Sequence, residues 1–225
     1  MCYSAMVIQS LKTLENCFLA HPIRQSFTDY EQKSQQDPKR FKPLADHPRI
    51  YPGYFAPLIL SEDRERVIRP MRYRLRPSWS DTEIPTKYNV FNARLDSLET
   101  RKSWQGLFMR QHGLLVFEKF YEWVVDEATG KKKCVSFYPD DREMMWAPCL
   151  WDRWTDGEQS LESFAIITTD PPPEISEAGH DRCPLFLRKD LIDAWLNPKG
   201  MTKKEMYKVL AQKEGSKFLC GDATA

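Results

Sequence analysis

The chain has 225 residues, with 33 Lys and Arg against 32 Asp and Glu, so its formal net charge is +1. This balance excludes a polyelectrolyte that binds nucleic acid through its overall charge, and any nucleic-acid site must be a local patch. Hydrophobic residues make up 41% of the chain, enough to fill a core, which excludes global disorder.

The sequence gives no sign of a membrane or a metal. No apolar run approaches the roughly 18 residues of a membrane span, and the first residues lack the basic and apolar segments of a signal peptide. Six cysteines are scattered without a CxxC pair, which argues against a zinc site and a disulfide scaffold. We therefore expect a cytoplasmic protein with no metal, no cofactor and no membrane partner.

The first predicted helix covers residues 5–19. Apolar side chains recur there at the spacing of one helical face, and His21-Pro22 ends the pattern. Residues 27–49 are polar and hold three prolines, so we expect a surface insertion. The residues of the predicted helical face are Val7, Leu11, Leu14 and Phe18.

Strands are predicted for the middle of the chain. Residues 50–60 are apolar and contain a Pro-Gly turn, and residues 163–169 are apolar up to a run of three prolines. Residues 113–125 and 131–138 indicate two strands joined by a tight turn that contains Thr129-Gly130.

Helical spacing returns near the end of the chain, at residues 189–196 and 202–212. We expect residues 197–225 to form a lysine-rich helical tail. Because strands dominate the middle and helices the two ends, the sequence predicts an α+β fold: one domain over residues 2–225 with a mostly antiparallel sheet.

A cluster of arginines lies within residues 64–76, which hold six arginines against one acid, Glu65. Arg72, Arg74 and Arg76 alternate with Tyr73 and Leu75. In an extended strand this spacing puts three guanidinium groups on one face. Such a face suits DNA phosphates, and a solvated charged strand explains the pattern equally well.

Cys2 is the first residue along the chain with a candidate chemical role. The initiator Met is usually trimmed before a small residue, which would leave a free α-amine beside the thiol of Cys2. Their reference pKa values, about 7.7–8.0 and about 8.5, make both groups usable nucleophiles near neutral pH. The amine can condense with an aldehyde, and the thiolate can then close a thiazolidine ring intramolecularly. The alternative is a frayed terminus without function.

Three further motifs have both a functional and a structural interpretation. Glu122 lies among aromatic residues; apolar surroundings raise the pKa of a carboxyl and suit proton transfer, unless the side chain points outward from an alternating strand. His180 could act as an acid or base or be an ordinary loop residue. Asn92 and Arg94 offer an amide and a phosphate-matching fork, or a turn Asn and a surface Arg.

Together these segments resemble the SOS response-associated peptidase family, whose domain is also called SRAP. The matching motifs follow the family's order and spacing from residue 2 to about residue 188. They are Met1-Cys2, Ala56-Pro57, Pro77 with Trp79, Asn92-Ala93-Arg94, Phe120-Tyr121-Glu122-Trp123, Phe164-Ala165-Ile166-Ile167-Thr168-Thr169 and His180-Asp181-Arg182-Cys183-Pro184-Leu185. The chain departs from the family in having Ser4 where many members have Arg, and in lacking the family's usual C-terminal strand segment.

The resemblance implies a single α+β domain around a β-barrel-like sheet. It implies a monomeric protein that senses abasic sites in single-stranded DNA, crosslinks to them covalently, and associates with the nucleoid when bound; autoproteolytic peptidase activity is also implied. The implied catalytic residues are Cys2 as nucleophile, Asn92 to position its amine, and Glu122 and His180 for proton transfer. The implied DNA contacts are Arg94, Arg182 and Trp79, to which we add Arg72 and Arg74 from the arginine cluster.

Two other classes of function remain open at this point. The residue types Cys, Asn, Glu and His would equally serve an N-terminal-nucleophile thiol peptidase or amidase without a DNA substrate. A DNA-binding module without catalysis, in which Cys2 is incidental, is the third possibility.

Overall fold

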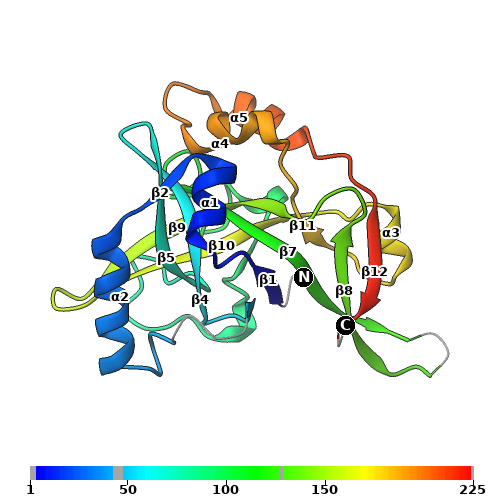
Figure 1. Cartoon of the computed structure of the whole chain (residues 1–225), viewed down its shortest axis with the longest axis horizontal. Coiled ribbons are helices and arrows are strands. Elements are labelled where there is room, and N and C mark those ends of the chain that lie inside the picture. Colours follow the sequence, from blue (N-terminus) through cyan, green and yellow to red (C-terminus); the bar gives the residue numbers. More distant parts are fainter. Residues whose placement is uncertain (1–3, 43–47, 127–128, 224–225) are drawn as a thin grey trace.

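The computed structural model describes residues 4–42, 48–126 and 129–223 (Figure 1). Strands make up the centre of the molecule, and short helices lie around it. The strands are β1 Ser4–Val7, β2 Ala20–Pro22, β3 Arg49–Ile50, β4 Phe55–Glu62, β5 Glu65–Tyr73, β6 Asn92–Arg94, β7 His112–Val125, β8 Lys132–Pro139, β9 Met145–Thr155, β10 Ser160–Thr169, β11 Cys183–Pro184 and β12 Phe218–Asp222. The helices are α1 Leu11–Phe18, α2 Arg24–Gln36, α3 Pro173–Glu177, α4 Ile192–Leu196 and α5 Lys203–Ala211, with 3₁₀ turns at Thr86–Tyr88, Leu95–Ser97 and Lys189–Leu191.

Five of the strands close into a ring. β5 pairs with β4, β4 with β7, β7 with β9 and β9 with β10, all antiparallel. The ring closes because β10 pairs with β5 in parallel, Ser163 opposite Arg72. The molecule is therefore an α+β domain around a mostly antiparallel, barrel-like sheet, as the resemblance implied.

Alternating side chains of the ring fill two cores, because successive residues of a strand point to opposite faces. One set points into the ring and includes Leu58, Leu115 and Phe164. The neighbouring residues Ile59 and Leu114 belong to the other set, which packs under α1, α4 and α5. The helices therefore cover the outside of the barrel rather than plugging it.

β7 continues beyond the ring and carries Glu122 in its second half. On one side β1 pairs with it, Ser4 opposite Tyr121. On the other side β8 pairs with it, Glu122 opposite Val135. The hairpin predicted over residues 113–125 and 131–138 is confirmed.

Gly113 and His112 join the barrel to α4. A Cβ atom on Gly113 would lie 2.7 Å from Cδ2 of Leu58, so β4 and β7 approach closely at this point. The Gly113 carbonyl accepts a hydrogen bond from Trp195 Nε1 at 2.8 Å. The His112 ring stacks on Trp195 with 3.7 Å between centroids. Burial lowers the pKa of His112 to about 4, so this imidazole is neutral and structural.

The predicted helix over residues 5–19 is only half present. Residues 4–7 form β1, and the helix begins at Leu11, where Ser10 Oγ accepts from the Thr13 N–H at 3.2 Å. Pairing with β7 outweighs the helical spacing of Val7, because a strand can bury the same apolar side chain between neighbours.

Residues 27–49 differ from the expected surface insertion. The segment contains most of α2, and its side chains Tyr30 and Phe41 are buried against Phe55 in a small third core. Two aromatic anchors therefore attach an otherwise polar stretch to the sheet. Residues 43–47 lie outside the described part of the chain.

The C-terminal residues 197–225 are more than a helical tail. The predicted helix is present as α5, but residues 218–222 form β12, which pairs antiparallel with β8. The expectation that residues 197–225 form only a helical tail is therefore wrong. Within the described residues, no helix has the length and apolar character needed to cross a bilayer.

Candidate functional site

A buried contact between a carboxyl and an imidazole joins two of the predicted site residues. Glu122 on β7 is 2% exposed, and its Oε2 lies 3.2 Å from Nε2 of His180, in the loop after α3. The same imidazole lies 2.7 Å, through Nδ1, from the carbonyl oxygen of Arg182. The strand and the loop thus meet at a carboxyl and an imidazole in direct contact.

The backbone of Arg182 and the carboxyl of Glu122 hold the His180 ring from two sides. Its Nδ1 lies 2.7 Å from the Arg182 carbonyl oxygen and 3.3 Å from the Arg182 backbone nitrogen. Burial raises the pKa of Glu122, and the hydrogen bond with His180 opposes that rise. A carboxyl with a raised pKa beside an imidazole is suited to proton transfer near neutral pH.

The end of β10 brings together three more predicted residues. β6 pairs with it in parallel, Asn92 opposite Ile166 and Arg94 opposite Thr168. Arg182 donates through Nη2 to the Thr168 carbonyl at 2.9 Å. Since His180 is bonded to Arg182, a continuous chain of contacts runs from β6 through β10 to Glu122.

Both arginines at this strand end face an aspartate. Arg94, with half its side chain exposed, forms a two-pronged pair with Asp96 at 3.1 and 2.6 Å. Arg182 is buried and pairs with Asp170 at 2.8 Å, an aspartate whose side chain is 88% exposed. The two carboxylates occupy positions that phosphate oxygens could take, because guanidinium groups bind both in the same geometry.

The predicted exposed face of Arg72, Arg74 and Arg76 is wrong. β5 ends at Tyr73, and Arg74 takes φ 127°, which breaks the strand alternation. Arg72 and Arg76 are buried, and Arg72 pairs with Glu83 at 2.7 Å.

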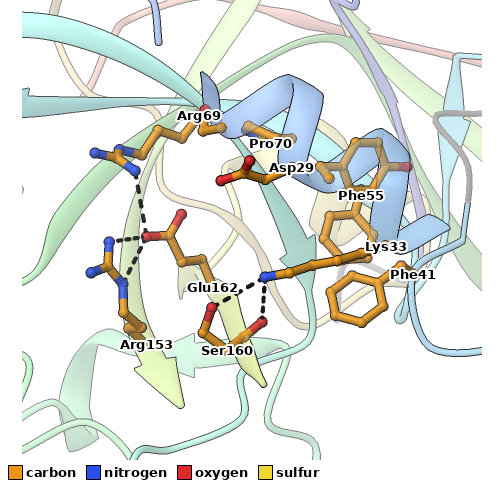
Figure 2. A pocket seen from close by; sticks show the side chains of 11 residues that line it. Asp29, Lys33, Phe41, Phe55, Arg69, Pro70, Arg153, Ser160 and Glu162 are labelled. Carbon is orange, nitrogen blue, oxygen red and sulfur yellow. Dashed lines mark hydrogen bonds and ion pairs between the residues drawn. The ribbon is translucent and has the colours of Figure 1, made fainter. Parts of the chain in front are cut away.

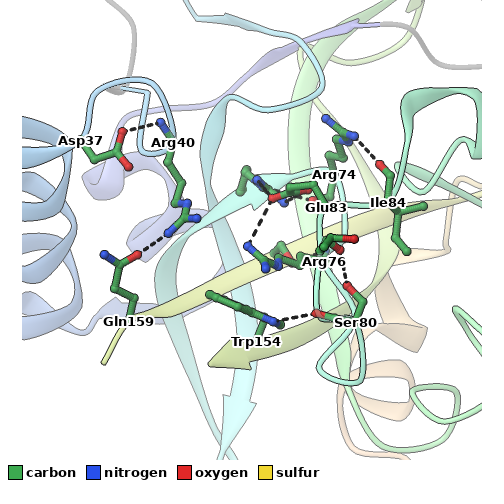
Figure 3. Close-up of polar contacts among 12 residues, drawn as sticks. Asp37, Arg40, Arg74, Arg76, Ser80, Glu83, Ile84, Trp154 and Gln159 are labelled. Carbon is green, nitrogen blue, oxygen red and sulfur yellow. Dashed lines mark hydrogen bonds and ion pairs between the residues drawn. The ribbon is translucent and has the colours of Figure 1, made fainter. Parts of the chain in front are cut away.

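Figure 3 shows that these guanidinium groups hold the loop after β5 in place. Arg74 donates to the carbonyl of Ile84, and Arg76 lies 3.3 Å above the Trp154 ring. Arg72 and Arg74, predicted as DNA contacts, are thus structural supports of residues 77–91.

That loop presents two exposed aromatic rings. Trp79 is 45% exposed, with Lys102 Nζ 4.0 Å from its ring. Tyr88, which the sequence analysis did not single out, is 52% exposed, with Lys87 Nζ 5.1 Å from its ring. Exposed rings beside cations suit bases of a single strand. The sequence could have pointed to Tyr88 through its position four residues before Asn92.

Cys2 lies outside the described residues, and the structure starts two residues later at Ser4. The Ser4 hydroxyl accepts a hydrogen bond from Arg49 Nε at 3.0 Å. The Arg49 guanidinium lies 3.5 Å from the Tyr121 ring, next to Glu122 in sequence. Sequence reasoning missed Arg49, because no motif surrounds it.

A separate cavity of about 240 Å³ lies between α2 and the sheet (Figure 2). Its charged side chains have polar partners: Arg153 binds Glu162, Lys33 donates to the Ser160 carbonyl at 3.2 Å, and Asp29 accepts from Gln25. Its lining contains none of the predicted site residues. Within the described part of the chain, no cluster of three or more potential metal ligands occurs.

Comparison with characterised sequences agrees with the motifs. The family model described as SOS response associated peptidase (SRAP) matches residues 1–222. The abasic site processing protein HMCES of Gallus gallus is 25% identical over 181 residues, 70% of this chain and 53% of that protein. YMR114C of Saccharomyces cerevisiae, described in the same way, is 30% identical over 151 residues, 64% of this chain and 39% of that protein. The chain thus spans about half the length of the curated relatives it matches.

Solved structures support the fold. A protein from Bacteroides thetaiotaomicron superimposes with a TM-score of 0.74 at 20% identity, over 97% of this chain and 90% of that one. A protein from Bordetella bronchiseptica gives 0.72 at 17% identity, over 98% of both chains. The arrangement of strands is therefore shared. Together with a family model that matches nearly every residue, this places the chain in the SOS response-associated peptidase family.

Proposed function

We propose that this chain recognises abasic sites in single-stranded DNA and forms a covalent thiazolidine with them through Cys2, after removal of Met1. The observation that carries the proposal is the buried Glu122–His180 pair. It lies at the part of β7 that pairs with β1, the first described strand.

The covalent chain restricts where Cys2 can act. Two residues span at most about 7 Å when fully extended, and Ser4 lies opposite Tyr121, which directly precedes Glu122. The short chain between Cys2 and this pairing supports the assignment of Cys2 as the nucleophile.

The residues supply a balanced reaction. The Cys2 amine adds to the C1′ aldehyde of the ring-opened deoxyribose, and loss of water leaves an imine. The thiolate then adds to the same carbon, and the electron pair of the C=N bond returns to nitrogen, which takes up a proton. The overall result is one thiazolidine and one water.

Each step moves a proton that the buried pair can handle. Ring opening transfers a proton from the C1′ hydroxyl to the ring oxygen, and loss of water needs an acid. Glu122 in its protonated form serves as that acid, since burial raises its pKa. His180 returns the proton through Nε2, and its Nδ1 bond to Arg182 fixes the ring for this exchange.

DNA recognition in this proposal uses phosphates and shape. An abasic site presents no base edge, so the contacts must be to the backbone and to neighbouring bases. Arg94 and Arg182 provide guanidinium groups at the end of β10, and Trp79 and Tyr88 provide rings for stacking. Asn92, buried next to Tyr73, positions the Cys2 amine. The printed names of the relatives, abasic site processing proteins, support the same substrate.

The test is adduct formation with a uracil-containing oligonucleotide treated with uracil glycosylase. Without borohydride, the wild-type chain should give a slowly migrating band on a denaturing gel, and Cys2→Ala and Cys2→Ser should give none. Both variants keep the α-amine but lack the thiol, so their adduct should be seen only after borohydride trapping. Cys17→Ala, a change at an exposed cysteine of α1, is the matched control and should react like wild type. Equal adduct from wild type and Cys2→Ala would overturn the proposal.

The same variants distinguish the alternative amidase activity from crosslinking to DNA. An N-terminal-nucleophile amidase would turn over a peptide or amide substrate without DNA and lose that turnover in Cys2→Ala. Amide turnover without any adduct on abasic DNA would replace the proposed function with that one.

A further inference from the structure

Lys213 lies at the same strand end as Arg94 and Arg182, although it comes from the C-terminal segment between α5 and β12 (Figure 1). Its Nζ donates to Thr169 Oγ1, at the last residue of β10, over 3.1 Å. An antiparallel bridge pairs the backbone of Lys213 with that of Leu187, and the N–H of Glu214 donates to the Phe186 carbonyl at 2.9 Å. The position of this lysine is therefore built into the fold.

Lys213 differs from its two cationic neighbours in whether a carboxylate lies beside it. Arg94 is paired with Asp96, and Arg182 with Asp170. For Lys213, which is exposed, no carboxylate lies within 4.0 Å among residues 4–42, 48–126 and 129–223. Within that part of the chain, Lys213 therefore adds an uncompensated positive charge to the end of β10.

Cys183, opposite Thr169 on β11, is a buried neighbour of this strand end. Burial raises the pKa of its thiol to about 12, and the charges of Lys213 and Arg182 oppose the rise. Lys213 and Arg182 thus both lie near the same buried thiol.

We propose that Lys213 binds a backbone phosphate of the single-stranded DNA, beside the phosphate held by Arg182; this inference rests on the proposed function. An ammonium group has three donors, of which Thr169 takes one, so two remain for phosphate oxygens. An uncompensated cation gains more from a phosphate than an arginine that must first release its aspartate. Lys213 is a DNA-positioning residue and takes no part in the bond-forming steps.

The test measures binding to an unmodified single-stranded oligonucleotide, which has no aldehyde and does not depend on Cys2. Fluorescence anisotropy over a range of KCl concentrations gives the slope of log K against log salt. Each phosphate contact to a single strand contributes about 0.7 to that slope. Lys213→Gln should lower the slope by about 0.7 and weaken binding equally for two unrelated sequences, and Lys213→Arg should keep both. Lys204→Gln, at an exposed lysine of α5, is the matched control.

A second measurement separates positioning from chemistry. With abasic oligonucleotide, Lys213→Gln should raise the DNA concentration that gives half-maximal crosslinking rate and leave the saturating rate unchanged. An unchanged salt slope in Lys213→Gln, or wild-type protein that does not bind unmodified single strands, would overturn the role of Lys213. Normal binding with no adduct from wild type would instead overturn the proposed crosslinking and leave the phosphate contact supported.

Discussion

The Glu122 side chain combines a cost to stability with a benefit to reaction. An acid whose pKa is raised by burial keeps its proton to a higher pH in the folded state than in the unfolded chain. Its contribution to stability is therefore present at low pH and is lost as the pH rises through the folded pKa. The hydrogen bond from His180 to the carboxyl offsets part of this loss of folding stability.

Glu122→Gln should therefore separate the two effects. We expect the rate of adduct formation to fall by about 10²-fold, since an acid–base group is lost. We also expect the variant to gain stability relative to wild type as the pH rises through the raised pKa of the wild-type carboxyl, because no buried carboxyl remains to ionise. Single-turnover gels and urea unfolding at several pH values would show both effects. Glu118→Gln, at an exposed position of the same strand, should change neither.

At the residue scale, the sequence motifs identified the candidate acid–base residues but not the residues that surround them. Glu122 and His180 could be identified from their motifs, whereas their contact across the fold could not. Arg49 and Lys213 carry no motif and reach the site only through pairing of distant segments. Their positions depend on tertiary structure, which no local pattern encodes.

At the scale of elements, the loop after β5 depends on a small cluster of charges. Arg72 and Arg76 are buried and share one carboxylate, that of Glu83. Alternation of residues predicted these arginines on one open face. The strand in fact stops at Tyr73, and the positive φ of Arg74 turns the chain inward. By contrast, the hairpin of β7 and β8 was predictable because its pairing is local.

Removal of the shared carboxylate should loosen this loop. We expect Glu83→Gln to lower the free energy of unfolding by about 2 kcal/mol, because two buried guanidinium groups lose a charged partner. Amide hydrogen exchange should increase within residues 77–91 and stay constant in β7. Asp81→Asn, a neutralisation of an exposed neighbour, is the comparison. Equal exchange in Glu83→Gln and wild type would contradict a clamping role.

The joint between α4 and the barrel should respond to acid. His112 has a folded pKa of about 4 against 6.5 for the free side chain, so the unfolded chain binds more protons between those values. Stability should therefore fall as the pH drops from about 6.5 to about 4, by up to about 3 kcal/mol. Urea unfolding of wild type and His112→Gln would test this. The variant should have lower stability at neutral pH and a flatter pH profile, whereas His21→Gln, at an exposed histidine, should keep the wild-type profile.

At the scale of the whole molecule, the sequence predicted the α+β class and most strands, but it missed the N-terminal strand β1 and the C-terminal strand β12. β1 forms because β7 lies beside it, and β12 because β8 does. In each case the partner is far away in sequence. Closure of the ring is the same kind of feature, since it depends on the parallel pairing of β5 with β10.

The packing of β4 against β7 depends on the small size of Gly113. An added methyl group would meet Leu58 at 2.7 Å, so Gly113→Ala should reduce the free energy of unfolding by about 2 kcal/mol. Leu58→Val in the same chain should recover part of that loss, and a double-mutant cycle by urea unfolding measures the coupling. Purely additive effects would show that the two residues do not press on each other.

A single continuous strand, β7, carries Gly113 near one end, where it packs against β4, and the carboxyl of Glu122 near the other. The barrel core and the acid–base pair therefore share one stretch of backbone, and a substitution that shifts β7 in the barrel acts on the strand that positions Glu122.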